Sequence, residues 1–62
     1  MSLKDRSIRY RAKHNVSQKE FATMCGVDVM TINKIETEKS NNPTQLTKAK
    51  IEMILRKDEE EE

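Results

Sequence analysis

The 62-residue sequence has only one cysteine, the residue that forms disulfides, and only one glycine and one proline, the residues that interrupt helices and strands. It has no tryptophan. A lone cysteine cannot form a disulfide within the chain, which excludes a disulfide framework and is typical of a reducing, cytoplasmic environment. Cys25 and the single histidine, His14, give no metal-ligand spacing. No metal or other cofactor is therefore expected, and we predict that Cys25 is a buried apolar residue.

The sequence also lacks the features of enzymes and of membrane proteins. It has no paired carboxylates, no nucleophile–base set and no glycine-rich phosphate loop, so we do not expect an enzyme. No signal-peptide pattern opens the chain, and no segment approaches the ~18 apolar residues of a membrane span. A chain of this length is one domain with a thin core, which leaves little room for a catalytic cleft or a cofactor pocket, and no small-molecule ligand is expected.

Charge is abundant and unevenly placed. Five of the 11 acidic residues form the last five positions, Asp58 to Glu62, whereas residues 1–57 hold all 12 lysines and arginines against six acids. We therefore predict a basic domain over residues 1–57 and a disordered acidic tail over 58–62. A net charge of +6 on the domain favours a polyanionic partner, and the tail is either a solubilising segment or a competitor for the basic face.

The pattern of capping residues predicts an all-α fold of four helices. Ser2 caps a first helix that ends near residue 13, and Ser17 with Glu20 forms a capping box at the start of a second helix. Gly26 ends that helix after residue 25, because glycine readily adopts the left-handed conformation. Asp28 caps a third helix, which ends near residue 36.

The last helix is expected to run from Pro43 to about residue 56, with Asn42 as its cap. The first and last helices offer apolar residues for burial, namely Leu3, Ile8, Tyr10, Ala12, Leu46, Ala49, Ile51, Met53, Ile54 and Leu55.

The spacing around Gly26 predicts a helix-turn-helix. A tight turn between crossing helices needs a small residue where they approach, a glycine at the corner and apolar inner faces. Ala22 and Gly26 supply the first two, and the six inward positions as a set are Phe21, Ala22, Cys25, Val27, Ile32 and Ile35. This register leaves Val29, Met30, Asn33 and Lys34 facing outward on the third helix, as insertion into a DNA major groove requires.

The stretch from Val16 to Ala22, the pair Gly26–Val27 and the segment from Thr31 to Glu36 resemble the phage repressor/Cro-like helix-turn-helix family. The resemblance covers about residues 3–55. It implies a compact, lambda-repressor-like four-helix bundle and a role in transcription control.

The resemblance assigns contacts with double-stranded DNA to one set of residues: Gln18, Val29, Met30, Thr31, Asn33, Lys34, Lys39, Ser40, Asn41 and Asn42. In this family, Gln18 contacts phosphate or buttresses a base-reading side chain, and residues 39–42 together with the start of the last helix touch the DNA backbone. The resemblance also implies a structural ion pair between Arg11 and Glu36.

Three positions depart from the family pattern. Val29 and Met30 replace polar residues, so they can contact a thymine methyl group but cannot make bidentate hydrogen bonds to bases. Ser7 stands where a large apolar residue is usual, so either Ile8 replaces it through a shifted helix or the core is thinner there. The acidic end replaces a fifth helix that often forms the dimer interface, and the sequence leaves open a monomer or a homodimer.

Two hypotheses follow from the sequence. The first is a sequence-specific transcriptional regulator from a phage, plasmid or similar bacterial element, which inserts the helix at 28–36 into the major groove. The second is a protein-interaction module, such as an antirepressor or antitoxin-like partner, that reuses the helix-turn-helix fold. The apolar pair Val29 and Met30 on the reading surface motivates the second hypothesis.

Overall fold

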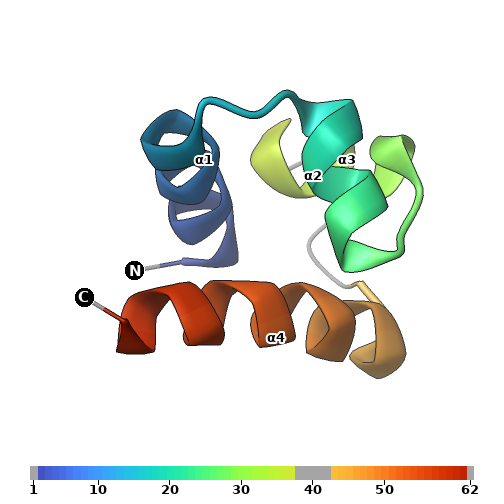
Figure 1. Cartoon of the computed structure of the whole chain (residues 1–62). Coiled ribbons are helices and arrows are strands. Elements are labelled where there is room, and N and C mark those ends of the chain that lie inside the picture. The colour runs from blue at the N-terminus through green and yellow to red at the C-terminus, as the bar shows by residue number, and fades with distance from the viewer. Residues whose placement is uncertain (1, 38–42, 62) are drawn as a thin grey trace.

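The computed structural model describes residues 2–37 and 43–61, and four helices make up nearly all of this part of the chain. They are α1 (Leu3–His14), α2 (Gln18–Cys25), α3 (Val29–Thr37) and α4 (Gln45–Glu60), with no strand in the described residues. The all-α, four-helix prediction is confirmed. In Figure 1, α4 lies along one side of the bundle formed by the other three helices, and the end of α4 lies near the start of α1.

The first three helices begin at the capping residues that the sequence predicted, and α2 ends at Gly26 as predicted. The hydroxyl groups of Ser2 and Ser17 accept hydrogen bonds from the backbone N–H groups three residues further along, and the Glu20 side chain completes the capping box. The Asp28 carboxylate accepts from the backbone N–H of Met30 at 3.0 Å. Asn15 ends α1 in the left-handed conformation, with φ of 55°.

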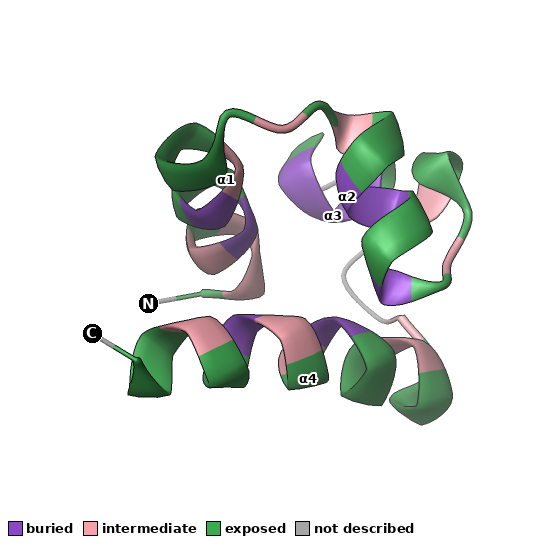
Figure 2. Cartoon of the chain, viewed as in Figure 1, coloured by how far each residue is buried: buried purple, intermediate pink, exposed green. Residues whose placement is uncertain are grey.

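A single apolar core lies where the four helices face one another, as the buried residues in Figure 2 show. Its buried members come from every helix: Tyr10, Phe21, Ala22, Cys25, Ile32, Ile35, Ile51 and Leu55. Among the six predicted inward positions of the helix-turn-helix, five are buried, and Val27 packs half-buried against them. The helix-turn-helix register is therefore confirmed.

The first helix contributes less to this core than the sequence suggested. Ile8 is 39% exposed and Ala12 is exposed, whereas Ser7 is fully buried and Leu3 is half-buried. Ile8 therefore does not replace the missing apolar residue at position 7. The alternative of a thinner core is correct, because the helix directs Ser7 inward and its neighbour Ile8 toward solvent.

The fourth helix differs from the prediction at both ends. It begins at Gln45 with Thr44 as its cap, so the predicted start at Pro43 is wrong; the predicted cap, Asn42, lies outside the described residues. It continues to Glu60, so the predicted disordered tail from Asp58 is also wrong for residues 58–60. No structural boundary separates residues 57 and 58. Of the apolar residues expected to be available for burial in this helix, Leu46, Ala49 and Met53 are exposed.

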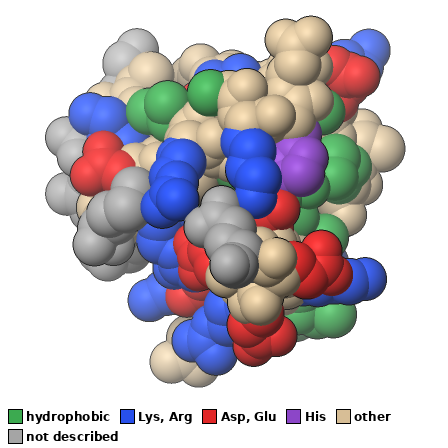
Figure 3. Space-filling model, turned by 60° about the vertical axis from the view of Figure 1, so that its left-hand side comes forward, with side chains coloured by type: hydrophobic (Ala, Val, Ile, Leu, Met, Phe, Trp, Pro, Cys, Tyr) green, Lys and Arg blue, Asp and Glu red, His purple; other side chains and the backbone are tan. Residues whose placement is uncertain are grey.

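Ion pairs join the acidic end of α4 to α1. Arg6 makes two hydrogen bonds of 2.9 Å to the Glu59 carboxylate, and its Nη1 lies 2.6 Å from Glu52 Oε1. Asp58 lies 2.8 Å from His14 Nε2 and 3.3 Å from Lys13 Nζ. Figure 3 shows basic and acidic side chains interleaved on this face. In the described part of the chain, no helix has the length and apolar character needed to cross a membrane.

Candidate nucleic-acid interface

The turn between α2 and α3 depends on one glycine. Gly26 has φ of 76°, a left-handed conformation that is costly for residues with a Cβ atom. The next backbone N–H, that of Val27, donates to the carbonyl oxygen of Ala22 at 3.0 Å and so satisfies the end of α2. Asp28 then caps α3. Gly26, Val27 and Asp28 thus form a turn that is tight enough for α3 to pack against α2.

The two sides of α3 differ in burial and chemistry. Ile32 is fully buried and Ile35 is 7% exposed, whereas Asn33 and Lys34 are exposed on the other side. At the start of the helix, Met30 is 62% exposed, and the outward orientation predicted for these residues is confirmed. The helix therefore presents an apolar first turn followed by an amide and an ammonium group.

The remaining predicted contact residues have different surroundings. Val29 is 38% exposed, and Thr31 is half-buried. Residues 39–42, which were expected to touch the DNA backbone, lie outside the described part of the chain. At the described start of α4, the Thr44 hydroxyl accepts from the backbone N–H of Thr47 at 3.2 Å.

The expected ion pair between Arg11 and Glu36 is present and ties α1 to the end of α3. Arg11 Nε donates to Glu36 Oε2 at 2.8 Å, and Nη2 donates to Oε1 at 2.5 Å. The Glu36 side chain is only 4% exposed, so the guanidinium is the main compensation for burying its charge. Hydrogen bonding to Glu36 in turn raises the pKa of Arg11 above its ordinary value.

This ion pair continues as a chain of hydrogen bonds to the exposed side of α3. Gln18 Nε2 donates to Glu36 Oε1 at 3.1 Å, and Asn33 Nδ2 donates to Gln18 Oε1 at 3.3 Å. We call these two hydrogen bonds, which join Glu36, Gln18 and Asn33, the amide relay. The bond between Gln18 and Asn33 joins residues 15 positions apart. The family resemblance, rather than any sequence spacing, predicted that Gln18 could support a side chain of the third helix.

Cys25 belongs to the core beneath this surface. Burial raises the pKa of its thiol to about 11, so the thiol is protonated at neutral pH. A protonated, buried thiol is neither a nucleophile nor a metal ligand. Cys25 therefore packs as a small apolar residue.

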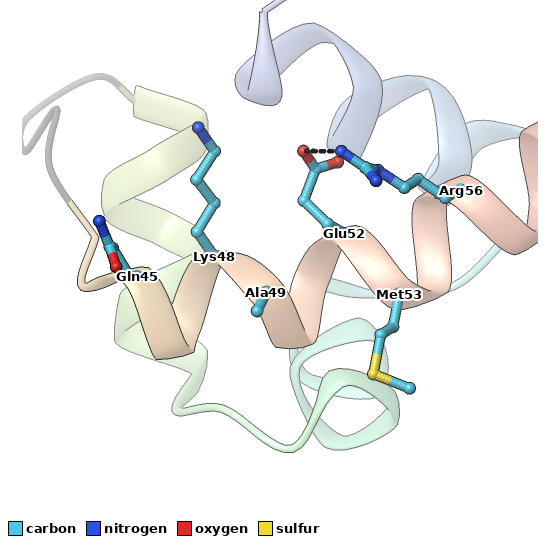
Figure 4. A pocket seen from close by; sticks show the side chains of 6 residues that line it. All are labelled: Gln45, Lys48, Ala49, Glu52, Met53 and Arg56. Carbon is cyan, nitrogen blue, oxygen red and sulfur yellow. Dashed lines mark ion pairs between the residues drawn. The ribbon is translucent and has the colours of Figure 1, made fainter.

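A shallow hollow along α4 is a separate surface feature, shown in Figure 4. Six side chains line it: Gln45, Lys48, Ala49, Glu52, Met53 and Arg56. Glu52 forms ion pairs with Arg6 and Arg56, so its charge is already neutralised. The hollow therefore combines an exposed methionine with paired charges, and its chemistry differs from that of the outer side of α3.

A sharp glycine turn, a buried inner side on α3 and polar residues on its outer side are the features of a helix-turn-helix, and a family model described as helix-turn-helix matches residues 8–61. The chain belongs to the helix-turn-helix family. No curated protein and no solved structure matches it. Membership of the helix-turn-helix family supports DNA binding as the class of function.

Proposed function

We propose that this helix-turn-helix chain is a sequence-specific, double-stranded DNA-binding transcriptional regulator of the repressor/Cro type. It acts in the cytoplasm by inserting α3 into the major groove. The observation that carries the proposal is the exposure of Asn33 and Lys34 on the side of α3 opposite Ile32 and Ile35. An α-helix fits the major groove, and amide and ammonium side chains are the groups that hydrogen-bond to base edges there.

The proposed contacts divide by chemistry. Asn33 and Lys34 face base edges, and Val29, Met30 and Thr31 supply apolar or hydroxyl contacts near the start of the helix. Lys39 and the polar residues up to Asn42 approach the phosphates, which fix the position of the protein but carry no sequence information. Because basic residues release condensed counterions, affinity falls steeply with salt.

Fluorescence anisotropy tests the proposal with wild type on random duplexes and on duplexes selected from a random pool, at two salt concentrations. Lys34→Ala should weaken binding to the selected duplex about tenfold, because a lost base contact costs about 1–3 kcal/mol. Lys57→Ala, at an exposed position on α4, is the matched control and should have little effect. Absence of binding at low salt would refute the proposal.

The exposure of Met30 favours a second function, that of a protein-interaction module built on the same fold. An apolar side chain at the start of the reading helix fits a protein groove as well as a thymine methyl group. Binding to one protein that Met30→Glu abolishes, with no sequence preference on DNA, would establish this function. The selected DNA also reports the working unit, since half-sites one helical turn apart indicate a homodimer and a single short site indicates a monomer.

A further inference from the structure

The hollow along α4 lies between two rows of side chains, each with a spacing of four residues. One row is Gln45, Ala49 and Met53, and the other is Lys48, Glu52 and Arg56. In Figure 4, the charged row extends to one side of α4 and Met53 to the other. Rows with this spacing are the ridges of an α-helix, and the space between them accepts a ridge of side chains from a second helix. The hollow thus has the form of a helix-packing groove that no helix of the described chain occupies.

The apolar side of the hollow is unusually exposed. Met53 and Leu46 are 73% and 68% exposed, more than any other large apolar residue in the described chain. They lie seven positions apart and so share one side of the helix, with the exposed Ala49 between them. The small side chain of Ala49 lets a second helix approach closely. Exposed apolar surface with a polar rim is typical of a protein-interaction site.

The charged side of the hollow has an excess of positive charge. Glu52 Oε1 lies 2.6 Å from Arg6 Nη1, so a residue of α1 already neutralises this carboxylate. Arg56 is 3.9 Å from Glu52 and its side chain is 70% exposed, which leaves guanidinium donors open to solvent. Lys48 is exposed and makes no hydrogen bond or ion pair with the described residues. An occupant of the hollow therefore has to bring carboxylates as well as apolar side chains.

We propose that the hollow along α4 binds an amphipathic helix of a second protein, with apolar side chains packed on Met53 and carboxylates paired with Lys48 and Arg56. Charge complementarity favours this partner over a second copy of the chain, because the only carboxylate in the hollow is already paired. DNA phosphates would meet the cations but leave the apolar side without a partner. This inference goes beyond the proposed function and does not depend on DNA binding.

Helical peptides selected on the full chain supply the probes. An alanine-rich helical peptide, varied along one side and displayed on phage, is selected on the immobilised protein. We expect the enriched peptides to carry apolar residues three or four positions apart, with Asp or Glu on one flank. The best peptide is then synthesised with its carboxylates and with the corresponding amides. The amide form should bind at least fivefold more weakly, and added salt should reduce this difference.

Two variants test the apolar side of the hollow by fluorescence anisotropy with the selected peptide. Met53→Ser removes the apolar side chain and should weaken binding at least tenfold. Ala49→Gln fills the space between the two rows and keeps high helix propensity, so it should weaken binding to a similar extent. Met24→Ser is the matched control, since Met24 is an exposed methionine on α2 outside the hollow. It should bind like wild type.

Lys48→Gln tests the charged side. It should weaken binding of the carboxylate peptide about threefold to fivefold and have little effect on the amide peptide, because the two changes remove one contact. Lys57→Gln is the matched control, at an exposed position of α4 outside the hollow. Thermal melting checks that each variant is folded. Met53→Ser should bind selected DNA as tightly as wild type does.

Several results would overturn the inference. If no peptide is enriched, or if the enriched peptides bind Met53→Ser as tightly as wild type, the hollow is not a docking site. A wild-type dimer that becomes a monomer in Met53→Ser, measured by analytical ultracentrifugation, would assign the hollow to a second copy instead. Binding of phosphatidylserine vesicles or of random DNA that Met53→Ser abolishes would likewise contradict it. Failure of wild type to bind DNA at low salt would refute only the proposed function.

Discussion

The helix-turn-helix and the contact between α1 and α4 stabilise the same domain by different means. Within the helix-turn-helix, Phe21 and Ile32 are fully buried, and the Arg11–Glu36 pair, which ties this region to α1, has a buried carboxylate. The contact between α1 and α4 relies on ion pairs whose carboxylates include Asp58 and Glu59, at the end of the last helix. Salt hardly weakens apolar packing or a buried ion pair, whereas it screens partly exposed ion pairs, which add less to the free energy of unfolding.

This difference matches what each region has to do. A helix that reads bases must hold its side chains in fixed positions, because each base contact depends on hydrogen-bond geometry. The end of α4 has no such requirement in the proposed function. We therefore expect the helix-turn-helix to be the rigid part of the domain and the α1–α4 contact to be the part that responds to solution conditions.

The largest expected difference in stability is between substitutions of two α1 arginines, Arg11 and Arg6, one for each region. Arg11→Met should lower the free energy of unfolding by about 3 kcal/mol, because it leaves the buried Glu36 charge without its partner. Arg6→Met should cost about 1 kcal/mol, since the Glu59 side chain is 39% exposed and regains water, and Glu52 keeps Arg56 as a second partner. Urea denaturation of both variants measures the difference.

If Arg11→Met and Arg6→Met lowered the free energy of unfolding equally, the two regions would not be stabilised by different means. Arg56→Met serves as the control for loss of charge, because the Arg56 side chain is 70% exposed and lies 3.9 Å from Glu52. It should unfold at nearly the same urea concentration as wild type.

Substitution of Ser7 is expected to have a smaller effect, and to stabilise the protein rather than destabilise it. Its hydroxyl is fully buried and has no hydrogen-bond partner among the described residues. Ser7→Ala should raise the free energy of unfolding by about 1 kcal/mol, because it removes an unsatisfied polar group and introduces a better helix former. Thermal melting measures this gain.

Ser2→Ala is the matched control on the same helix. The Ser2 hydroxyl accepts from the backbone N–H of Asp5 at 3.1 Å, so its removal should lower stability by about 1 kcal/mol. A loss of stability in both variants would show that the Ser7 hydroxyl is satisfied in solution.

The helix-turn-helix could be predicted from the sequence because its signals are local. Ser17 and Glu20 lie three positions apart, Gly26 stands at the corner, and the inward residues follow the helical period. Each signal lies within the two helices and the turn between them, so residues near in sequence determine it. The match of the helix-turn-helix family over residues 8–61 agrees with this prediction.

The end of α4 and the amide relay depend on residues that are distant in sequence. Asp58 and Glu59 appear in the sequence as part of an acidic run, which is typical of disorder. Their partners in α1 lie 44 to 53 positions away, and only the packing of α4 beside α1 brings them together. The relay shows the same limit, since Gln18 and Asn33 meet only after the turn at Gly26 has formed.

The smallest expected effect concerns pH and the end of α4. A hydrogen bond from His14 lowers the pKa of Asp58, and one from Arg6 lowers the pKa of Glu59. Carboxyl groups with a lowered pKa in the folded state stabilise it at pH values above about 4, near their pKa in the unfolded chain. This contribution is lost as pH falls through the folded-state pKa. Asp58→Asn should therefore unfold at a slightly lower urea concentration than wild type at pH 7, and the difference should shrink by pH 3.

Glu60→Gln separates the ion pairs from the general effect of negative charge at the carboxyl end of a helix. Both substitutions remove one negative charge near the end of α4, where the helix dipole disfavours it. Only Asp58 lies within reach of Lys13 and His14 in the contacts described above. If Asp58→Asn and Glu60→Gln gave the same pH profile, the α1–α4 ion pairs would not form in solution. The end of the chain would then behave as the disordered tail that its composition suggests, and it would not stabilise the helix-turn-helix.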